Sequence, residues 1–214
     1  MDILINGVWY EVENDDQEEA RRALARGRRE DQGAHDHEGA AQGHAQRGLV
    51  SQETVRVLSM TKPWAWMVVS GDKDVENRRW TTSYRGPFLV HAAMGMSERD
   101  YLDAWEWVES RFGRVVWDRI PARDALVRGA IVGRAVIVDV VPPDLGMDCP
   151  DPWHMGAQYG FRLHDRSAIP VPVHHRGGLG LRKLDLAKAE AMWPGTREWA
   201  RRATASVVRP GCVQ

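Results

Sequence analysis

Charged side chains between residues 71 and 80 have types and spacing that suit acid–base chemistry. Lys73 and Glu76 lie three residues apart, and Arg78 follows. On one strand, positions 73 and 76 would face opposite ways, so they converge only if a bulge or turn intervenes near Gly71. If they converge, each favours the charged form of the other. Glu76 could then act as a general base on water, while Lys73 or Arg78 stabilises an oxyanion. The alternative is a structural ion pair that catalyses nothing.

Basic and aromatic residues interleave in the same segment and suit nucleic-acid binding. Arginines such as Arg78 and Arg85 contact phosphates, whereas Trp80 and Tyr84 could stack on an unpaired base. Each residue alone could equally be a solvated charge or a core ring, but together they favour single-stranded or flipped-base recognition. The predicted nucleic-acid-binding residues are Lys62, Trp64, Asn77, Arg78, Trp80, Tyr84, Arg85, His175 and Arg176.

Histidines are the remaining candidates for chemistry. His91 lies in an apolar run and is either a hydrogen-bonded core residue or a site residue. His174 and His175 are adjacent in an extended segment and point opposite ways, so at most one faces the cleft. A zinc site built from His91, His175 and Glu76 lacks a recognisable ligand motif. We therefore predict no metal and no other cofactor.

The elements that must position these residues follow from local patterns. Residues 63–70 are predicted as a helix with Thr61 as N-cap and Gly71 as its end. Trp64 and Trp66 lie about 200° apart on that helix, so one of them is a candidate for the binding groove. Strands or extended segments are expected at 55–60, 74–80, 87–94, 129–141, 159–163, 170–175 and 179–184.

Two further helical regions are expected. One spans 97–112, where Ser97 and Asp100 approximate a capping box. Its predicted core stripe is Tyr101, Leu102, Trp105, Val108 and Phe112, with Trp107 off the stripe and exposed. The other region spans 185–202, with a break at Pro194.

The first 48 residues have a different composition from the rest. Asn6-Gly7 between apolar runs predicts a two-residue hairpin, 15–30 a charged helix, and 31–48 a linker. Residues 1–50 carry 11 Asp and Glu against 6 Arg, a balance of −5, whereas the remainder carries 19 acids and 23 bases, a balance of +4. The predicted organisation is an acidic leader at 1–48, a main domain at 50–185 and a helical tail at 186–214.

Composition also bounds the environment of the protein. No apolar run approaches the roughly 20 residues that span a bilayer, and the N-terminus lacks the basic and apolar regions of a secretory signal. The two cysteines do not make a disulfide framework. We therefore expect a cytoplasmic protein with no membrane partner, and the oligomeric state stays open.

A series of short motifs runs in order through the main domain. In the first half these are Leu58-Ser59-Met60, Pro63-Trp64-Ala65, Gly71-Asp72-Lys73, Glu76-Asn77-Arg78, Arg85-Gly86 and His91-Ala92. In the second half they are Pro152-Trp153, Tyr159-Gly160-Phe161, Pro172-Val173 and Arg176-Gly177-Gly178-Leu179-Gly180-Leu181. The series resembles the ASCH family, the activating-signal-cointegrator homology domains. The resemblance implies an α+β fold with a small PUA-like β-barrel and flanking helices, to which this chain adds an N-terminal hairpin–helix appendage.

The same resemblance implies two classes of function. Some ASCH and PUA-like domains bind RNA or DNA, whereas some small ASCH enzymes deacylate 4-N-acetylcytidine, and others are linked to ribonuclease activity. The amidase pattern implies a Lys with a Thr three residues later, and this chain has Glu76 at the Thr position. A second departure is His174-His175 where Pro-Cys is common. We therefore predict a binder of RNA, DNA or a modified nucleoside, and the alternative is a hydrolase that uses Lys73 and Glu76.

Overall fold

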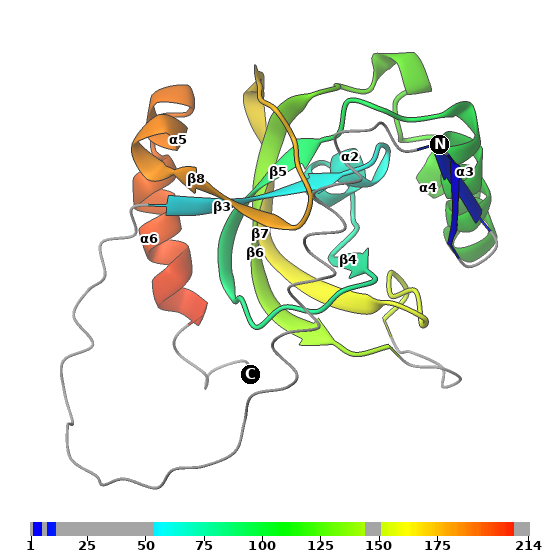
Figure 1. Ribbon diagram of the computed structural model, residues 1–214, viewed down its shortest axis with the longest axis horizontal. Helices are drawn as coiled ribbons and strands as arrows, with labels where there is room; N and C mark the ends of the chain where they lie inside the picture. The colour runs from blue at the N-terminus through cyan, green and yellow to red at the C-terminus, as the bar shows by residue number, and fades with distance from the viewer. Residues whose placement is uncertain (1, 6–7, 12–53, 144–150, 208–214) are drawn as a thin grey trace, which may run out of the picture. The chain divides into compact units, whose positions relative to one another are not determined.

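The computed structural model describes residues 2–5, 8–11, 54–143 and 151–207 (Figure 1). The chain forms two units, Met1–Leu49 and Val50–Gln214. In the first unit, β1 (Asp2–Ile5) and β2 (Val8–Glu11) pair antiparallel with Ile5 opposite Val8, which confirms the predicted hairpin. The predicted helix at 15–30 and linker at 31–48 lie outside the described residues.

A six-stranded sheet organises the second unit, in the order β4-β7-β6-β5-β3-β8. Its strands are β3 (Thr54–Met60), β4 (Val75–Arg78), β5 (Gly86–Ala92), β6 (Ala130–Val141), β7 (Tyr159–His174) and β8 (Leu181–Asp185). Among the strand pairs of the described residues, only β3–β5 is parallel. The sheet with its helices confirms the α+β prediction. Within the described residues β4 and β8 do not pair, so the sheet is open and the closed barrel is not observed.

Strand β7 is longer than the sequence predicts. The two expected segments, 159–163 and 170–175, belong to one strand from Tyr159 to His174. Its pairing with β6 shifts register at three places, and Asp165 has a positive φ of 46°. In the sequence, polar residues between the two segments interrupt the apolar pattern. In the structure, β7 continues through these residues because its pairing with β6 is irregular.

Both faces of the sheet are covered (Figure 1). Helix α2 (Trp64–Val69) packs on one face, which contributes Leu58, Phe88 and Val90 to the core. Helices α5 (Leu186–Met192) and α6 (Thr196–Val207) cover the opposite face. Alternate residues of each strand reach opposite faces, so neighbouring residues of one strand enter different cores.

Helix α2 begins later than predicted and lies very close to the sheet. Its N-cap is Pro63 and has no side-chain capping bond, so the predicted Thr61 cap is wrong. Thr61 lies two residues before the cap position, and its carbonyl accepts a bond from Ala65 N at 3.2 Å. A Cβ on Gly133 of β6 would lie 2.4 Å from Val69 Cγ1. Glycine at 133 therefore permits this close approach of α2.

Helix α3 (Glu98–Phe112) forms a third layer beyond α2 and precedes α4 (Arg114–Trp117). Its capping box of Ser97 and Asp100 is present as predicted. The predicted stripe was wrong at Leu102, which is 47% exposed. Trp107 is partly buried rather than exposed, because α3 also packs against Trp153, at 6.0 Å between ring centroids.

The C-terminal helices confirm the predicted break near Pro194. Helix α5 ends at Met192 and α6 begins at Thr196. The Asp185 side chain at the end of β8 accepts a bond from Lys188 N at 2.9 Å and so caps α5. Among the described residues, no helix is both long and apolar enough to span a membrane.

Candidate functional site

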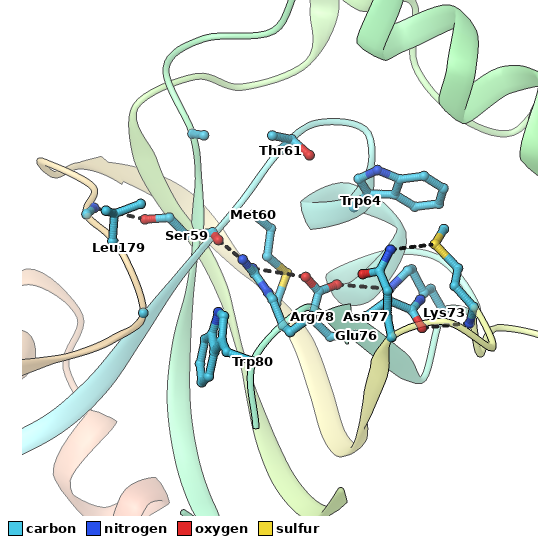
Figure 2. A pocket seen from close by; sticks show the side chains of 15 residues that line it. Ser59, Met60, Thr61, Trp64, Lys73, Glu76, Asn77, Arg78, Trp80 and Leu179 are labelled. Atoms are coloured by element: carbon cyan, nitrogen blue, oxygen red, sulfur yellow. Dashed lines mark hydrogen bonds and ion pairs between the residues drawn. The ribbon is translucent and has the colours of Figure 1, made fainter. Parts of the chain in front are cut away.

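A cavity of about 650 Å³ opens beside the end of β3, next to β4 (Figure 2). Its lining comes from six stretches of the chain: the end of β3, the start of α2, the segment 73–80 that contains β4, the residue after β5, residues 155–158, and the loop before β8. The lining residues are Ser59, Met60, Thr61, Trp64, Lys73, Glu76, Asn77, Arg78, Trp80, Ala93, Met155, Gln158, Gly178, Leu179 and Gly180.

Three charged side chains meet in the cavity wall. Lys73 Nζ lies 2.9 Å from Glu76 Oε2, and Arg78 Nη2 lies 2.9 Å from Glu76 Oε1. The side chains of Lys73 and Glu76 are only 1% and 7% exposed. Lys73 precedes β4, in the turn after α2, so the alternation of a strand does not separate it from Glu76. Lys73 and Glu76 therefore converge, because a turn after Gly71 separates Lys73 from the strand.

Burial and charge act in opposite directions on this triad. Burial alone would raise the pKa of Glu76, but the charges and hydrogen bonds of Lys73 and Arg78 outweigh it and hold the pKa below its usual value. Burial lowers the pKa of Lys73, and Glu76 offsets only part of that effect. Glu76 is therefore a charged acceptor at neutral pH, with both carboxylate oxygens already engaged.

Asn77 fixes one wall of the cavity. Its Nδ2 donates to the carbonyl of Trp153 at 2.9 Å, and its Oδ1 accepts from Met155 N at 2.8 Å. Both side-chain groups are thus used to hold residues 153–155 against β4. Asn77, a predicted binding residue, thus lines the cavity, and its side-chain amide positions residues 153–155.

Two tryptophans flank the charged triad, as Figure 2 shows. Trp64, on the first turn of α2, packs edge-on against Trp107, with 5.6 Å between ring centroids. Lys73 Nζ lies 5.6 Å from the ring centroid of Trp64. Trp80 packs edge-on against Phe161 at 5.1 Å. Both rings are partly buried and held by other rings, so they present fixed apolar surfaces to the cavity.

Five predicted binding residues lie outside this lining, and three of them have partners elsewhere in the fold. Lys62 is buried, donates to the carbonyl of Met94 at 3.0 Å and borders a separate cavity of about 250 Å³ with Trp66. The Tyr84 hydroxyl donates to the carbonyl of Pro87 at 2.7 Å. Arg85 lies 3.4 Å from a carboxylate oxygen of Asp139.

The predicted histidine region lies next to the cavity. His91 Nδ1 is 3.1 Å from Ser59 Oγ, and His91 Nε2 is 2.8 Å from the carbonyl of His175. Burial lowers the pKa of His91, and both ring nitrogens have partners, so it is a hydrogen-bonded core histidine. His175 and Arg176 line a neighbouring groove.

The sequence reasoning missed part of the lining. The missed residues are Ser59, Met60, Thr61, Ala93, Met155, Gln158, Gly178, Leu179 and Gly180. The motifs Leu58-Ser59-Met60 and Gly178-Leu179-Gly180 were the available signal, but residues 58–60 and 179–180 were interpreted as strand. Strand β8 begins at Leu181, which leaves 178–180 as a loop.

One comparison with known proteins identifies a family for this chain. A family model described as the ASCH domain matches residues 58–172. None of the curated proteins matches the chain. The matched range runs from Leu58 in β3 to Pro172 in β7 and includes every lining residue of the cavity except 178–180. Because the match covers more than half of the sequence, the chain belongs to the ASCH domain family.

Proposed function

We propose that this ASCH domain binds a single-stranded nucleic acid, RNA or DNA, and takes one unpaired base into the cavity. ASCH domains are generally associated with nucleic-acid binding or hydrolysis. The observation that carries the proposal is the placement of Trp64 and Trp80 on either side of a buried charged triad in one cavity. The cavity volume of about 650 Å³ falls within the range typical of small-molecule pockets.

The lining offers both interactions that a base requires. Fixed indole rings stack on the π-face of any base, which is worth about 1–3 kcal/mol per base. The Thr61 hydroxyl and the Gln158 amide border the same space and can read the polar edge of a base. Enclosure by Met60, Met155 and Leu179 favours an unpaired base over a paired one, because a duplex cannot insert a stacked base.

Hydrolysis of a modified nucleoside or of RNA is the second candidate. A buried amine with a lowered pKa, Lys73, lies in the cavity beside a carboxylate, which is the observation that favours it. The pKa of Glu76 argues against this residue as the general base. It is held below its usual value, whereas general bases work best with a pKa near the working pH. The ion-paired arrangement therefore supports binding as the first candidate.

Fluorescence titration with short oligonucleotides tests the proposal. We expect single-stranded RNA or DNA 12-mers to bind and the corresponding duplexes to bind much more weakly. Trp80→Ala should weaken single-strand affinity roughly 5- to 150-fold, the equivalent of one lost stacking contact. Trp193→Ala is the matched control, because Trp193 is also partly buried but packs on Trp199 at 6.5 Å, beside α6. Equal effects of the two substitutions, or equal binding of duplex, would contradict the proposal.

Incubation with 4-N-acetylcytidine separates the two candidates. We expect the wild type to show at most slow deacylation, and Glu76→Gln to keep oligonucleotide affinity within a few-fold. Rapid wild-type deacylation that falls by about two to four orders of magnitude in Glu76→Gln would favour the hydrolase. Activity that persists in Glu76→Gln but is lost in Lys73→Ala would identify Lys73 as the base.

A further inference from the structure

A groove of about 210 Å³ lies beside the cavity and shares two residues with it, Ser59 and Gly178. Its walls are the β3–β8 pair and the segment that follows β7. The residues lining the groove are Val57, Ser59, His175, Arg176, Gly178, Arg182, Lys183 and Leu184. The groove and the cavity are therefore neighbours that meet at these two residues.

The groove is cationic and lacks counter-charges. Arg176, Arg182 and Lys183 are exposed and line it together, and its lining contains no carboxylate. In the part of the chain that the structure describes, none of these three cations forms an ion pair. Other exposed arginines do form such pairs, for example Arg119 with Asp72 at 2.8 Å. The positive charge of the groove is therefore available to an external anion.

Ser59 and Gly178 hold the groove and the cavity in a fixed relationship. Ser59 Oγ accepts a bond from Gly178 N at 3.1 Å, which ties the loop before β8 to the end of β3. A Cβ on Gly178 would lie 2.2 Å from Arg182 Nη1, so glycine at this position lets the guanidinium lie against the loop. The Arg182 head group is thus placed at the junction between the two spaces.

We propose that this groove holds a backbone phosphate of the same strand whose base occupies the cavity, so that the ligand is an oligonucleotide rather than a free nucleoside. The inference rests on the proposed function. Planar guanidinium groups bind phosphate oxygens in a bidentate manner, and such contacts fix the register of a nucleic acid. Arg176 was among the predicted nucleic-acid-binding residues. Of the residues predicted to contact phosphates, Lys62 and Arg85 are engaged elsewhere with Met94 and Asp139, and Arg78 pairs with Glu76.

The test compares ligands with and without backbone phosphates. The full-length wild type is titrated with the four ribonucleosides and with the four matching homotrinucleotides. The groove variant is Arg176→Gln/Arg182→Gln. The control is Arg99→Gln/Arg114→Gln, which removes the same charge from exposed residues of α3 and α4 that line neither space. Thermal unfolding of each variant shows that it remains folded.

We expect the groove variant to lose about tenfold in trinucleotide affinity, the effect of one charge-assisted hydrogen bond, while its nucleoside affinity stays unchanged. The slope of log affinity against log salt should become less steep by about 0.7 for each lost phosphate contact. The control should match the wild type in both measurements.

The other outcomes distinguish failure of the inference from failure of the proposed function. If trinucleotides bind the groove variant and the wild type equally, with equal salt slopes, the phosphate site is overturned and the base-binding cavity stands. If the wild type binds nucleosides as tightly as trinucleotides, the phosphate site is overturned as well. If the wild type binds neither, the proposed function is overturned and the inference with it.

Discussion

Arg78 on β4 donates from Nη2 to the backbone carbonyl of Ser59 on β3, over 2.5 Å, and so links two strands that form no backbone pair with each other. The same nitrogen lies 2.9 Å from Glu76 Oε1. One guanidinium therefore both spans the open side of the sheet and orients the carboxylate in the cavity wall.

Replacement of Arg78 should reveal this double role. Arg78→Ala removes both contacts, and we expect the free energy of unfolding to fall by about 2–3 kcal/mol, since hydrogen bonds to charged groups are the stronger ones. Arg78→Lys keeps the charge but lacks the planar fork, so it should recover only part of the loss. Urea unfolding followed by circular dichroism measures both. A lysine variant as stable as the wild type would show that the fork is not required.

The Lys73–Glu76 pair should behave as a buried ion pair in a double-mutant cycle. Glu76→Gln leaves the buried amine of Lys73 without a counter-ion, and we expect it to cost about 3–5 kcal/mol of stability. Lys73→Met leaves Glu76 paired with Arg78, so it should cost less. The double variant should be far more stable than the sum of the two losses predicts. Simple additivity in chemical denaturation would show that the two groups are not coupled.

Lys62 should impose a pH dependence on stability in the alkaline range. Burial, followed by the charges of Arg128 and Arg123, lowers its pKa from 10.5 to about 8. Between about pH 8 and pH 10.5 the unfolded chain therefore binds more protons at this residue than the native chain does. The Lys62 contribution to stability thus rises with pH across this window.

Comparison of the wild type with Lys62→Met isolates that contribution. Melting temperatures measured from pH 7 to 10.5 should rise more, or fall less, for the wild type than for the variant. Parallel curves would show that the amine of Lys62 titrates normally in the folded protein.

Trp107 and Leu102 on α3 provide a matched pair for core packing. Trp107 contacts the rings of Trp64 and Trp153, at 5.6 and 6.0 Å between centroids, whereas Leu102 is exposed. We expect Trp107→Ala to cost about 3 kcal/mol and Leu102→Ala no more than about 0.5 kcal/mol. A larger loss for Leu102→Ala would contradict the observed orientation of the helix.

Removal of the first 49 residues should leave the second unit folded. The division between Leu49 and Val50 motivates this expectation, as does the linker composition of 31–48. A chain that begins at Val50 should unfold cooperatively, with a melting temperature within a few degrees of the full-length value. Loss of cooperative unfolding in calorimetry would instead show that the leader contributes to the core.

Local signals in the sequence were sufficient for some elements and misleading for others. Asn6-Gly7 predicted the hairpin and Ser97 with Asp100 predicted the start of α3, because both patterns act over a few residues. Leu102 and Trp107 were assigned the wrong way round, because the apolar face of α3 depends on what packs against it. Periodicity carries no information about that partner.

The candidate site shows the same limit. Lys73, Glu76, Arg78 and Trp80 are close in sequence, and their convergence could be anticipated. Gln158 and Leu179 reach the cavity only through the pairing of distant strands. Lys62 was predicted to bind nucleic acid because it is basic, yet it is buried and its amine donates to the carbonyl of Met94 inside the fold.

The pairing register of β3 makes part of the cavity wall independent of side-chain identity. β8 begins opposite Leu58, whereas β3 continues to Met60, so the last residues of β3 pair with β5 but not with β8. The wall of the cavity at Ser59 and Met60 is therefore formed in part by a strand edge. The amide and carbonyl groups of such an edge are the same for every amino acid except proline, which lacks the amide hydrogen. Side chains around this edge can diverge between family members and alter what is recognised. The edge itself persists through any substitution that leaves the strand in place.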